Sequence, residues 1–229
     1  MSEKILVIDT ATENCSAALL HNGRITEQSV EAPREHSQRI LPMVASLLEQ
    51  AGLALDDLDA VAFGRGPGSF TGIRIGTSIM QGLALGADLP VLPISNLAAM
   101  AQGAIEQGAS EVAAAIDARM GEVYFGHFVA EDGLAQLQGD EQVLAPEALM
   151  QQWQLGSDVV AVGTGFETYP QLAQAQNLRL EPSCRLPTAA MMVPLALQMW
   201  RSGAARSVTE VEPVYLRNTV AWKKLPGRE

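Results

Sequence analysis

The chain has 229 residues and carries 26 acidic against 15 basic side chains, a formal net charge of −11 at pH 7. This balance argues against an extensive nucleic-acid surface, which needs clustered Lys and Arg to bind phosphate. Hydrophobic residues make up 48% of the chain, enough for two cores of ordinary size, and no apolar run approaches the roughly 20 residues of a membrane helix.

The N-terminal sequence MSEKILVIDT passes directly into an apolar strand and has no signal-peptide cleavage pattern. We therefore expect a cytoplasmic protein that does not enter the membrane. The two cysteines, Cys15 and Cys184, are far apart in sequence, and in that compartment we expect reduced thiols rather than one disulfide bond.

The first half of the chain alternates short apolar runs with segments of helical periodicity, which is typical of an α/β fold. The Asn22-Gly23 pair predicts a tight hairpin turn, and Ser95 predicts a helix N-cap. The elements expected in chain order are strands 5–9, 16–20 and 24–30, helix 37–51, strand 61–64, helix 69–86, strand 90–93 and a helix that follows Ser95 and ends near residue 105.

Two patterns of the first half recur in the second half, in the same order. The strand, aspartate, strand pattern ILVIDTATENCSAALLHNG at residues 5–23 recurs as VAAAIDARMGEVYFGHFVAEDG at residues 112–133, so that Asp9 matches Asp117. The pattern DAVAFGRG in the first half is answered by DVVAVGTG in the second. Both recur after about 100 residues, which indicates two half-chains built on one plan.

The second half continues with an expected helix at 146–154, a strand at 159–162 and a helix at 189–201. A strand-hairpin-strand unit followed by helix, strand and helix is the ribonuclease-H-like plan. Its duplication is the architecture of the actin, sugar-kinase and Hsp70 group. We therefore predict this α/β fold with two lobes, residues 1–106 and 107–229, which pack together because no low-complexity linker separates them.

Actin-like ATPases hold a metal and phosphates with an early carboxylate and hydroxyls on the first hairpin of each lobe. Here Asp9, Thr10 and Thr12 fall on the first hairpin and Asp117 on the second. The first turn, DTAT, lacks the glycine that would let a phosphate approach the backbone closely. The alternative is structural, with both aspartates capping strand ends and accepting hydrogen bonds from turn amides.

The segment GRGPGSFTG at residues 64–72 is a glycine-rich turn that leads into a helix. Gly66 and Gly68 free the backbone and Ser69 can cap the helix, whose exposed amides would form an anion site. The segment is not a Walker A motif, since no Gly-Lys-Ser/Thr follows, and a tight turn with a good cap is the alternative. The hypothesis is a vestigial nucleotide or anion site formed by Asp9, Thr10, Thr12, Gly66, Gly68, Ser69 and Asp117.

No segment carries an evident catalytic constellation. The three histidines are far apart, and the sequence contains neither Cys-x-x-Cys nor Gly-x-Ser-x-Gly. We therefore predict no catalytic residue and no protein-built metal site. The enzyme alternative is an actin-like ATPase or phosphotransferase that uses Asp9 and Asp117. A second alternative, a peptidase, has no support, because the chain carries no arrangement of a nucleophile and a base.

The helices expected at 37–51 and 69–86 carry more apolar surface than one core requires. On the second helix, glycines and isoleucines share one face, which we assign to close packing, and a separate apolar face is then left for a partner. The alternative is that the second lobe or the C-terminal segment covers both faces. The predicted partner surface consists of Arg39, Ile40, Met43, Leu47, Phe70, Ile73, Thr77, Met80 and Ala84.

The motifs IDTATENCSAAL, PREHSQRILPM, AFGRGPGSFTGIRIG, AIDARMGEVY and PVYLRN closely resemble those of the bacterial TsaB family, also called YeaZ, along nearly the whole chain. The resemblance implies a cytoplasmic protein needed to make threonylcarbamoyladenosine beside the anticodon of tRNA. It implies a non-catalytic relative of TsaD, the subunit that transfers threonylcarbamoyl from its adenylate to the tRNA. Such a protein pairs with TsaD, works with the ATPase TsaE and self-associates through the same helical surface.

TsaD carries a histidine pair for a metal, and this chain has no such pair. The resemblance therefore implies that the chain needs no cofactor of its own, that any nucleotide lies at the junction with the partner, and that tRNA is bound mainly by the complex. The basic segment at 217–228, with Trp222, Lys223 and Lys224, would then make a minor nucleic-acid or partner contact or be a solvated terminus.

Overall fold

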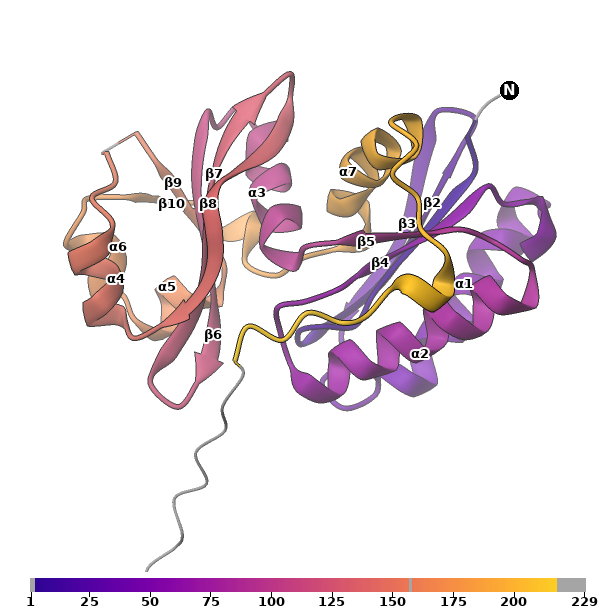
Figure 1. Cartoon of the computed structure of the whole chain (residues 1–229), viewed down its shortest axis with the longest axis horizontal. Coiled ribbons are helices and arrows are strands. Elements are labelled where there is room, and N and C mark those ends of the chain that lie inside the picture. Colours follow the sequence, from indigo (N-terminus) through magenta and orange to yellow (C-terminus); the bar gives the residue numbers. More distant parts are fainter. Residues whose placement is uncertain (1–2, 157, 218–229) are drawn as a thin grey trace, which may run out of the picture.

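The computed structural model of the protein describes residues 3–156 and 158–217. Its strands form two five-stranded sheets (Figure 1). The strands are β1 (Ile5–Asp9), β2 (Asn14–His21), β3 (Arg24–Glu31), β4 (Ala60–Gly64), β5 (Val91–Ile94), β6 (Glu111–Arg119), β7 (Glu122–Glu131), β8 (Leu134–Leu144), β9 (Val160–Val162) and β10 (Arg179–Leu180). The α-helices are α1 (His36–Ala51), α2 (Phe70–Gly86), α3 (Asn96–Glu106), α4 (Pro146–Gln152), α5 (Thr164–Thr168), α6 (Gln171–Gln174) and α7 (Ala189–Arg201). The short 3-10 turns are η1 (Leu55–Asp57), η2 (Pro182–Cys184) and η3 (Val208–Glu210).

The two sheets have the same topology. The first runs β3-β2-β1-β4-β5, and the second, read from the equivalent edge, runs β8-β7-β6-β9-β10. In each sheet the first three strands of the chain pair antiparallel, and the next two add in parallel beside the first. The predicted duplicated ribonuclease-H-like α/β fold is confirmed.

Most predicted elements are present within two residues of their expected ends. The matched hairpin turns, Asn22-Gly23 and Asp132-Gly133, have nearly equal left-handed φ angles of 52° and 71° in the first and 51° and 79° in the second. Asn, Asp and Gly tolerate this conformation, which matches the twist of the flanking strands. Helices α5 and α6 and strand β10 were not predicted, because two to five residues are too few for a periodic pattern.

Helices cover both faces of each sheet, so the lobes stack in layers (Figure 1). Helices α1 and α2 cover the outer face of the first sheet, and α7 covers its inner face. Helix α3 covers the inner face of the second sheet, whose outer face packs against α4, α5 and α6. The middle of the molecule is therefore the contact between α3 and α7.

The two middle helices lie against sheets in the other half of the sequence. Helix α3, on the first-half side of the predicted lobe boundary at residue 106, packs on β6, β7 and β8. Helix α7, from the second half, packs on β1, β2, β4 and β5. The predicted division at residue 106 therefore separates each helix from the sheet that it covers. This exchange of helices between the two halves of the chain interlocks the lobes. No sequence pattern indicated it.

The predicted partner surface is wrong for most of its residues, because they lie in the core of the first lobe. Met80 and Ile40 are 0% exposed and Ile73 is 1% exposed. The buried members are Ile40, Leu47, Ile73, Thr77, Met80 and Ala84, whereas Arg39 and Phe70 are exposed and Met43 is half-buried.

The reason is the position of the first hairpin rather than a fault in the periodicity. Gly72 and Gly76 do face a close neighbour, since a Cβ on either would meet Thr10. Gly82 and Gly86, which the sequence placed on the same packed face, have no atom within 4 Å of such a Cβ. The core therefore includes the side of α2 next to these two glycines. Of the remaining apolar residues of the helix, Ile79 and Leu83 pack against the edge of the core, whereas Phe70 and Leu85 are exposed.

None of the helices in the described part of the chain combines the length and the apolar character needed to cross a bilayer. The predicted basic contact segment lies outside the described residues, apart from Arg217.

We expect Met80→Asp to unfold the protein rather than to leave a folded monomer. Met80 is 0% exposed, and an unpaired carboxylate in an apolar core costs several kcal/mol, which is comparable with the stability of a typical domain. Leu85→Asp, on the same helix but at a side chain that is 66% exposed, is the matched control and should change the free energy of unfolding by less than about 1 kcal/mol. Urea denaturation followed by circular dichroism measures both, and equal stability of the two variants would contradict this assignment of the core.

Candidate functional site

A buried polar network lies where β1, the glycine-rich turn and α3 meet. Asp9 is 1% exposed, and its Oδ1 accepts hydrogen bonds from Asn96 Nδ2 at 2.8 Å and from the Ala11 amide at 3.2 Å. The Asn96 side chain also accepts a bond from the Gly66 amide at 2.9 Å. A Cβ at Gly64 would overlap Asp9 Oδ1, so this close approach requires glycine.

Asp9 is therefore a structural group rather than an exposed metal ligand. Its Oδ2 has no hydrogen-bond partner among the described residues. Burial disfavours the charged carboxylate and raises the pKa of Asp9 from 3.8 to about 6, although bonds from Asn96 and the Ala11 amide oppose the shift. The alternative structural role predicted for Asp9 agrees with this geometry.

The glycine-rich turn is closed against the first hairpin. The Ser69 amide donates to the Ala11 carbonyl at 2.7 Å, and the Ser69 hydroxyl accepts from the Gly72 amide at 3.3 Å as the N-cap of α2. A Cβ on Gly68 would overlap the Ala11 carbonyl oxygen, and one on Gly72 would overlap that of Thr10. The glycines thus serve the packing of backbone on backbone, and these amides are not directed at a ligand.

The two threonines of the first hairpin serve the same packing. Thr10 Oγ1 donates to the Gly72 carbonyl at 2.7 Å, and Thr12 Oγ1 accepts from the Asn14 amide at 3.4 Å. His36 Nε2 lies 2.8 Å from the Thr12 carbonyl oxygen. These contacts hold the hairpin turn to the starts of α1 and α2.

On the second hairpin, Asp117 bonds to its own turn. Its Oδ1 accepts from the Arg119 amide at 2.8 Å, and its Oδ2 pairs with the Arg119 guanidinium at 3.0 Å. The Asp117 amide donates to Thr164 Oγ1 at 3.1 Å. Asp9 and Asp117 are therefore equivalent in the fold but differ in environment, since one is buried and the other is paired with a cation.

A cleft of about 1160 Å³ separates the lobes. Of the predicted anion-site residues, Thr12, Gly68, Ser69 and Asp117 line it, whereas Asp9 and Thr10 are buried beneath it and Gly66 is also buried. Its walls carry arginines from both halves of the chain, namely Arg34, Arg74, Arg119, Arg185 and Arg217.

Carboxylates of the same walls balance part of this positive charge. Arg119 lies 3.2 Å from Glu13 of the first hairpin, and Arg185 lies 2.9 Å from Glu167. A phosphate group in the cleft would compete with these carboxylates for Arg119 and Arg185. The site is thus weaker for anions than its arginines alone indicate.

A second hollow, of about 390 Å³, lies over α2 and the start of α1. We name it the α1–α2 groove, and it is lined by Ser37, Phe70, Thr71, Arg74, Ile75, Ser78 and Ile79. The Arg74 guanidinium lies 3.3 Å from the centroid of the Phe70 ring, a cation–π contact. Leu41 and Leu85, on the same two helices, are 45% and 66% exposed. Of these residues only Phe70 belonged to the predicted partner surface.

The sequence held a signal for this groove. Ile75, Ile79 and Leu83 recur at helical spacing on α2, but the glycines beside them led to their assignment to the packed face. In the described residues, no group of three or more His, Cys, Asp or Glu side chains is placed to hold a metal ion. Cys15 and Cys184 are both buried free thiols, as the cysteine spacing predicted.

The family model of TsaD, tRNA N6-adenosine threonylcarbamoyltransferase, matches residues 25–225, so the chain is a member of the TsaD-like class of proteins. The tRNA threonylcarbamoyladenosine biosynthesis protein TsaB of Escherichia coli is 51% identical over 99% of this chain and 100% of its own length. TsaB of Haemophilus influenzae is 49% identical over 98% of each chain. The solved structure of YeaZ from Pseudomonas aeruginosa, 44% identical, superposes with a TM-score of 0.84 over 93% of this chain and all of that one. The chain belongs to the TsaB family, also called YeaZ, which confirms the resemblance of its motifs.

We expect Asp9→Asn to gain stability relative to the parent as the pH rises from 4 to 7.5. Below about pH 4, Asp9 is protonated in both the folded and the unfolded state, so burial costs nothing. Between pH 4 and pH 6, Asp9 is ionised in the unfolded parent but still protonated in the folded parent, because its folded-state pKa is about 6. The free energy of unfolding of the parent therefore decreases with pH over this range and is constant above it. The shift corresponds to at most about 3 kcal/mol in the free energy of unfolding.

Urea denaturation of both proteins across this pH range gives the difference directly. Asp132→Asn is the matched variant, because it makes the same substitution in the exposed turn that corresponds to Asn22. A difference between Asp9→Asn and the parent that stays constant with pH would mean that burial does not raise the pKa of Asp9.

Proposed function

We propose that this protein is a non-catalytic, activating subunit of the machinery that makes threonylcarbamoyladenosine in tRNA. It pairs with a TsaD-type subunit, which transfers threonylcarbamoyl from its adenylate to the adenosine 3′ of the anticodon, and it works with a TsaE-type ATPase in the cytoplasm. The tRNA is bound mainly by the complex. The chain requires no cofactor of its own, and any nucleotide lies at the junction with the partner.

The observation that carries the non-catalytic role is the closed glycine-rich turn. Its residues pack so tightly on the first hairpin that a Cβ at Gly68 or Gly72 would overlap the backbone of residues 10 and 11. Phosphate binding in related folds requires turn amides that face the ligand. Here the Gly66 and Ser69 amides bond to Asn96 and Ala11 instead.

The alternative of an actin-like ATPase that uses Asp9 and Asp117 gains no support from the geometry. Asp9 is buried beneath the cleft, and Asp117 is held by its ion pair with Arg119. Neither carboxylate is free to bind a metal through water without the loss of these contacts.

The α1–α2 groove is the surface that we propose for TsaD, and for self-association when TsaD is absent. Phe70 is 57% exposed and Leu85 is 66% exposed, while Ile75 and Ile79 are half-buried beside them. Exposed apolar side chains gathered on two adjacent helices are typical of a protein interface. The partner helix face that fits here is apolar, with an acidic group for Arg74.

The isolated protein should release no phosphate from Mg·ATP above background. The Gly66 and Ser69 amides are bonded within the protein and Asp9 is buried, so none of these groups is placed to bind the nucleotide. Phosphate release is measured at stoichiometric enzyme over hours, with Asp117→Asn as the matched variant. Magnesium-dependent hydrolysis that Asp117→Asn abolishes would favour the ATPase alternative.

We expect Ile79→Asp to weaken pairing with TsaD at least tenfold, which corresponds to about 1.4 kcal/mol. Because Ile79 also packs against the edge of the first core, the melting temperature of the isolated chain should fall, and the affinity is measured at a temperature at which circular dichroism shows the variant folded. Ile79 lines the groove, so a partner would bury the new carboxylate without a compensating charge. Leu180→Asp, at a 52% exposed leucine of the second sheet, is the control and should leave the affinity unchanged. Isothermal titration with TsaD measures both. Equal affinities for Ile79→Asp and the parent would place the interface elsewhere.

A further inference from the structure

After η3 the chain runs back across the molecule from the first lobe to the second (Figure 1). The segment Val211–Arg217 has no regular secondary structure, yet among its residues only Glu212 is exposed. Val211 is 4% exposed and belongs to the core of the first lobe. The segment is therefore packed along its length rather than loose.

Its middle is anchored to the first lobe at the end of β4. The Val214 amide donates to the Arg65 carbonyl at 3.0 Å, and a Cβ on Gly66 would lie 2.9 Å from the Val214 carbonyl oxygen. Gly66 has a φ of +103°, so only glycine fits this contact without strain. The Tyr215 ring packs against Phe70, with 5.5 Å between the ring centroids.

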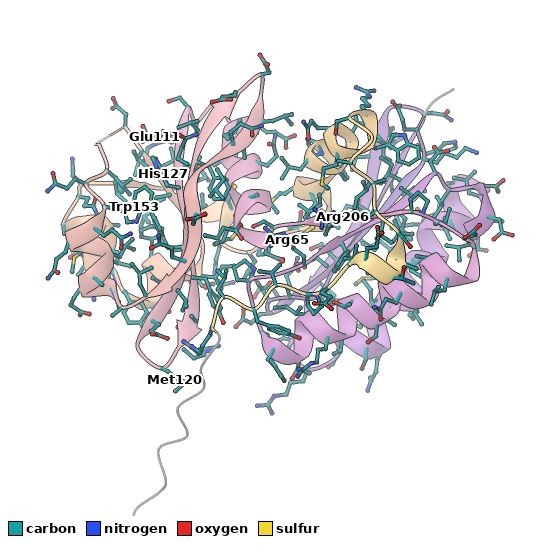
Figure 2. The ribbon with its side chains drawn as sticks, viewed as in Figure 1. Arg65, Glu111, Met120, His127, Trp153 and Arg206 are labelled. Atoms are coloured by element: carbon teal, nitrogen blue, oxygen red, sulfur yellow. The ribbon has the colours of Figure 1, made fainter. Side chains whose placement is uncertain are left out.

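Its end is anchored to the β6–β7 hairpin of the second lobe, the hairpin whose tip carries Met120 in Figure 2. Arg217 Nε donates to Glu122 Oε2 at 3.1 Å, and Arg217 Nη2 donates to the Arg119 carbonyl at 3.3 Å. The Arg217 side chain is 18% exposed, so this ion pair is better shielded than a typical surface pair.

A second contact between the lobes lies beside the first anchor. Arg65, which Figure 2 shows between the two lobes, pairs with Glu141 of β8 at 3.2 Å, and Glu141 also accepts a hydrogen bond from Ser95. The Glu141 side chain is 6% exposed. The segment therefore joins the lobes close to a buried ion pair that already connects them.

We propose that Val211–Arg217 is an interlobe strap that sets the opening of the cleft and couples it to the α1–α2 groove. Val214, Tyr215, Leu216 and Arg217 form part of the cleft wall. Phe70 and Arg74 line the cleft and the groove alike, and the Arg74 guanidinium lies 5.6 Å from the centroid of the Tyr215 ring. A molecule that displaces Phe70 or Arg74 in the groove must also disturb Tyr215. Occupation of the groove and opening of the cleft between the lobes are therefore energetically coupled.

The strap itself is tested without any partner. Spin labels on Glu49→Cys of α1 and Gln151→Cys of α4 report the distance between the lobes, and both native cysteines are 0% exposed and stay unlabelled. The full-length chain with Tyr215→Ala and Arg217→Ala should give a broader or longer distance distribution than the parent. Arg201→Ala, which removes an ion pair with Glu3 within the first lobe, should match the parent.

Superimposable distributions for the strap variant and the parent, with circular dichroism showing both folded, would overturn the proposal. If the double variant does not fold, Arg217→Gln, which breaks only the second anchor, takes its place with the same two outcomes.

The coupling to the groove rests on the proposed function and has its own readout, the affinity for TsaD. The strap variant should bind TsaD several-fold more weakly than Arg201→Ala. An unchanged affinity with an altered distance would retain the strap and overturn the coupling. Failure of the parent chain to bind TsaD would instead overturn the proposed function, and the distance measurement would still decide whether the strap exists.

Discussion

The arrangement of the molecule depends on the hydrogen bond between one buried carboxylate, that of Asp9, and the side-chain amide of Asn96. Asn96 donates to Asp9 at the end of β1 and accepts from Gly66 in the glycine-rich turn, so one side chain joins three segments that are far apart in sequence. Because Asn96 is also the first residue of α3, the same contacts fix the helix that covers the second sheet. Buried networks of this kind specify one arrangement when their bonds are made. Within this network, Asp9 Oδ2 has no partner among the described residues.

This network also holds the glycine-rich turn closed. The amides and glycines that would face a ligand are used to close the turn on the first hairpin, which stabilises the lobe. The cleft remains, but its positive charge is partly balanced by its own carboxylates. The outer face of α1 and α2 carries the α1–α2 groove, which Phe70, Ile75 and Ile79 line.

The lobes are interlocked more closely than two sequential domains would be. Helices α3 and α7 each cover the sheet of the other half of the chain, and they contact each other in the middle of the molecule. The segment that ends at Arg217 adds a further connection on the cleft side. Changes at the helical face and at the cleft are therefore difficult to separate, because Phe70 and Arg74 belong to both.

The sequence by itself determined the duplicated fold, since strand periodicity, the matched Asn22-Gly23 and Asp132-Gly133 turns and the caps at Ser69 and Ser95 are local signals. Its motifs also determined the family, because identity extends along the whole chain. Only the tertiary structure decided which face of α2 is buried, where α3 and α7 pack and what Asp9 does. Helical periodicity shows that Met80 and Ile79 lie on different faces but not which face meets the hairpin, and the burial of a carboxylate depends on neighbours such as Asn96 that are distant in sequence.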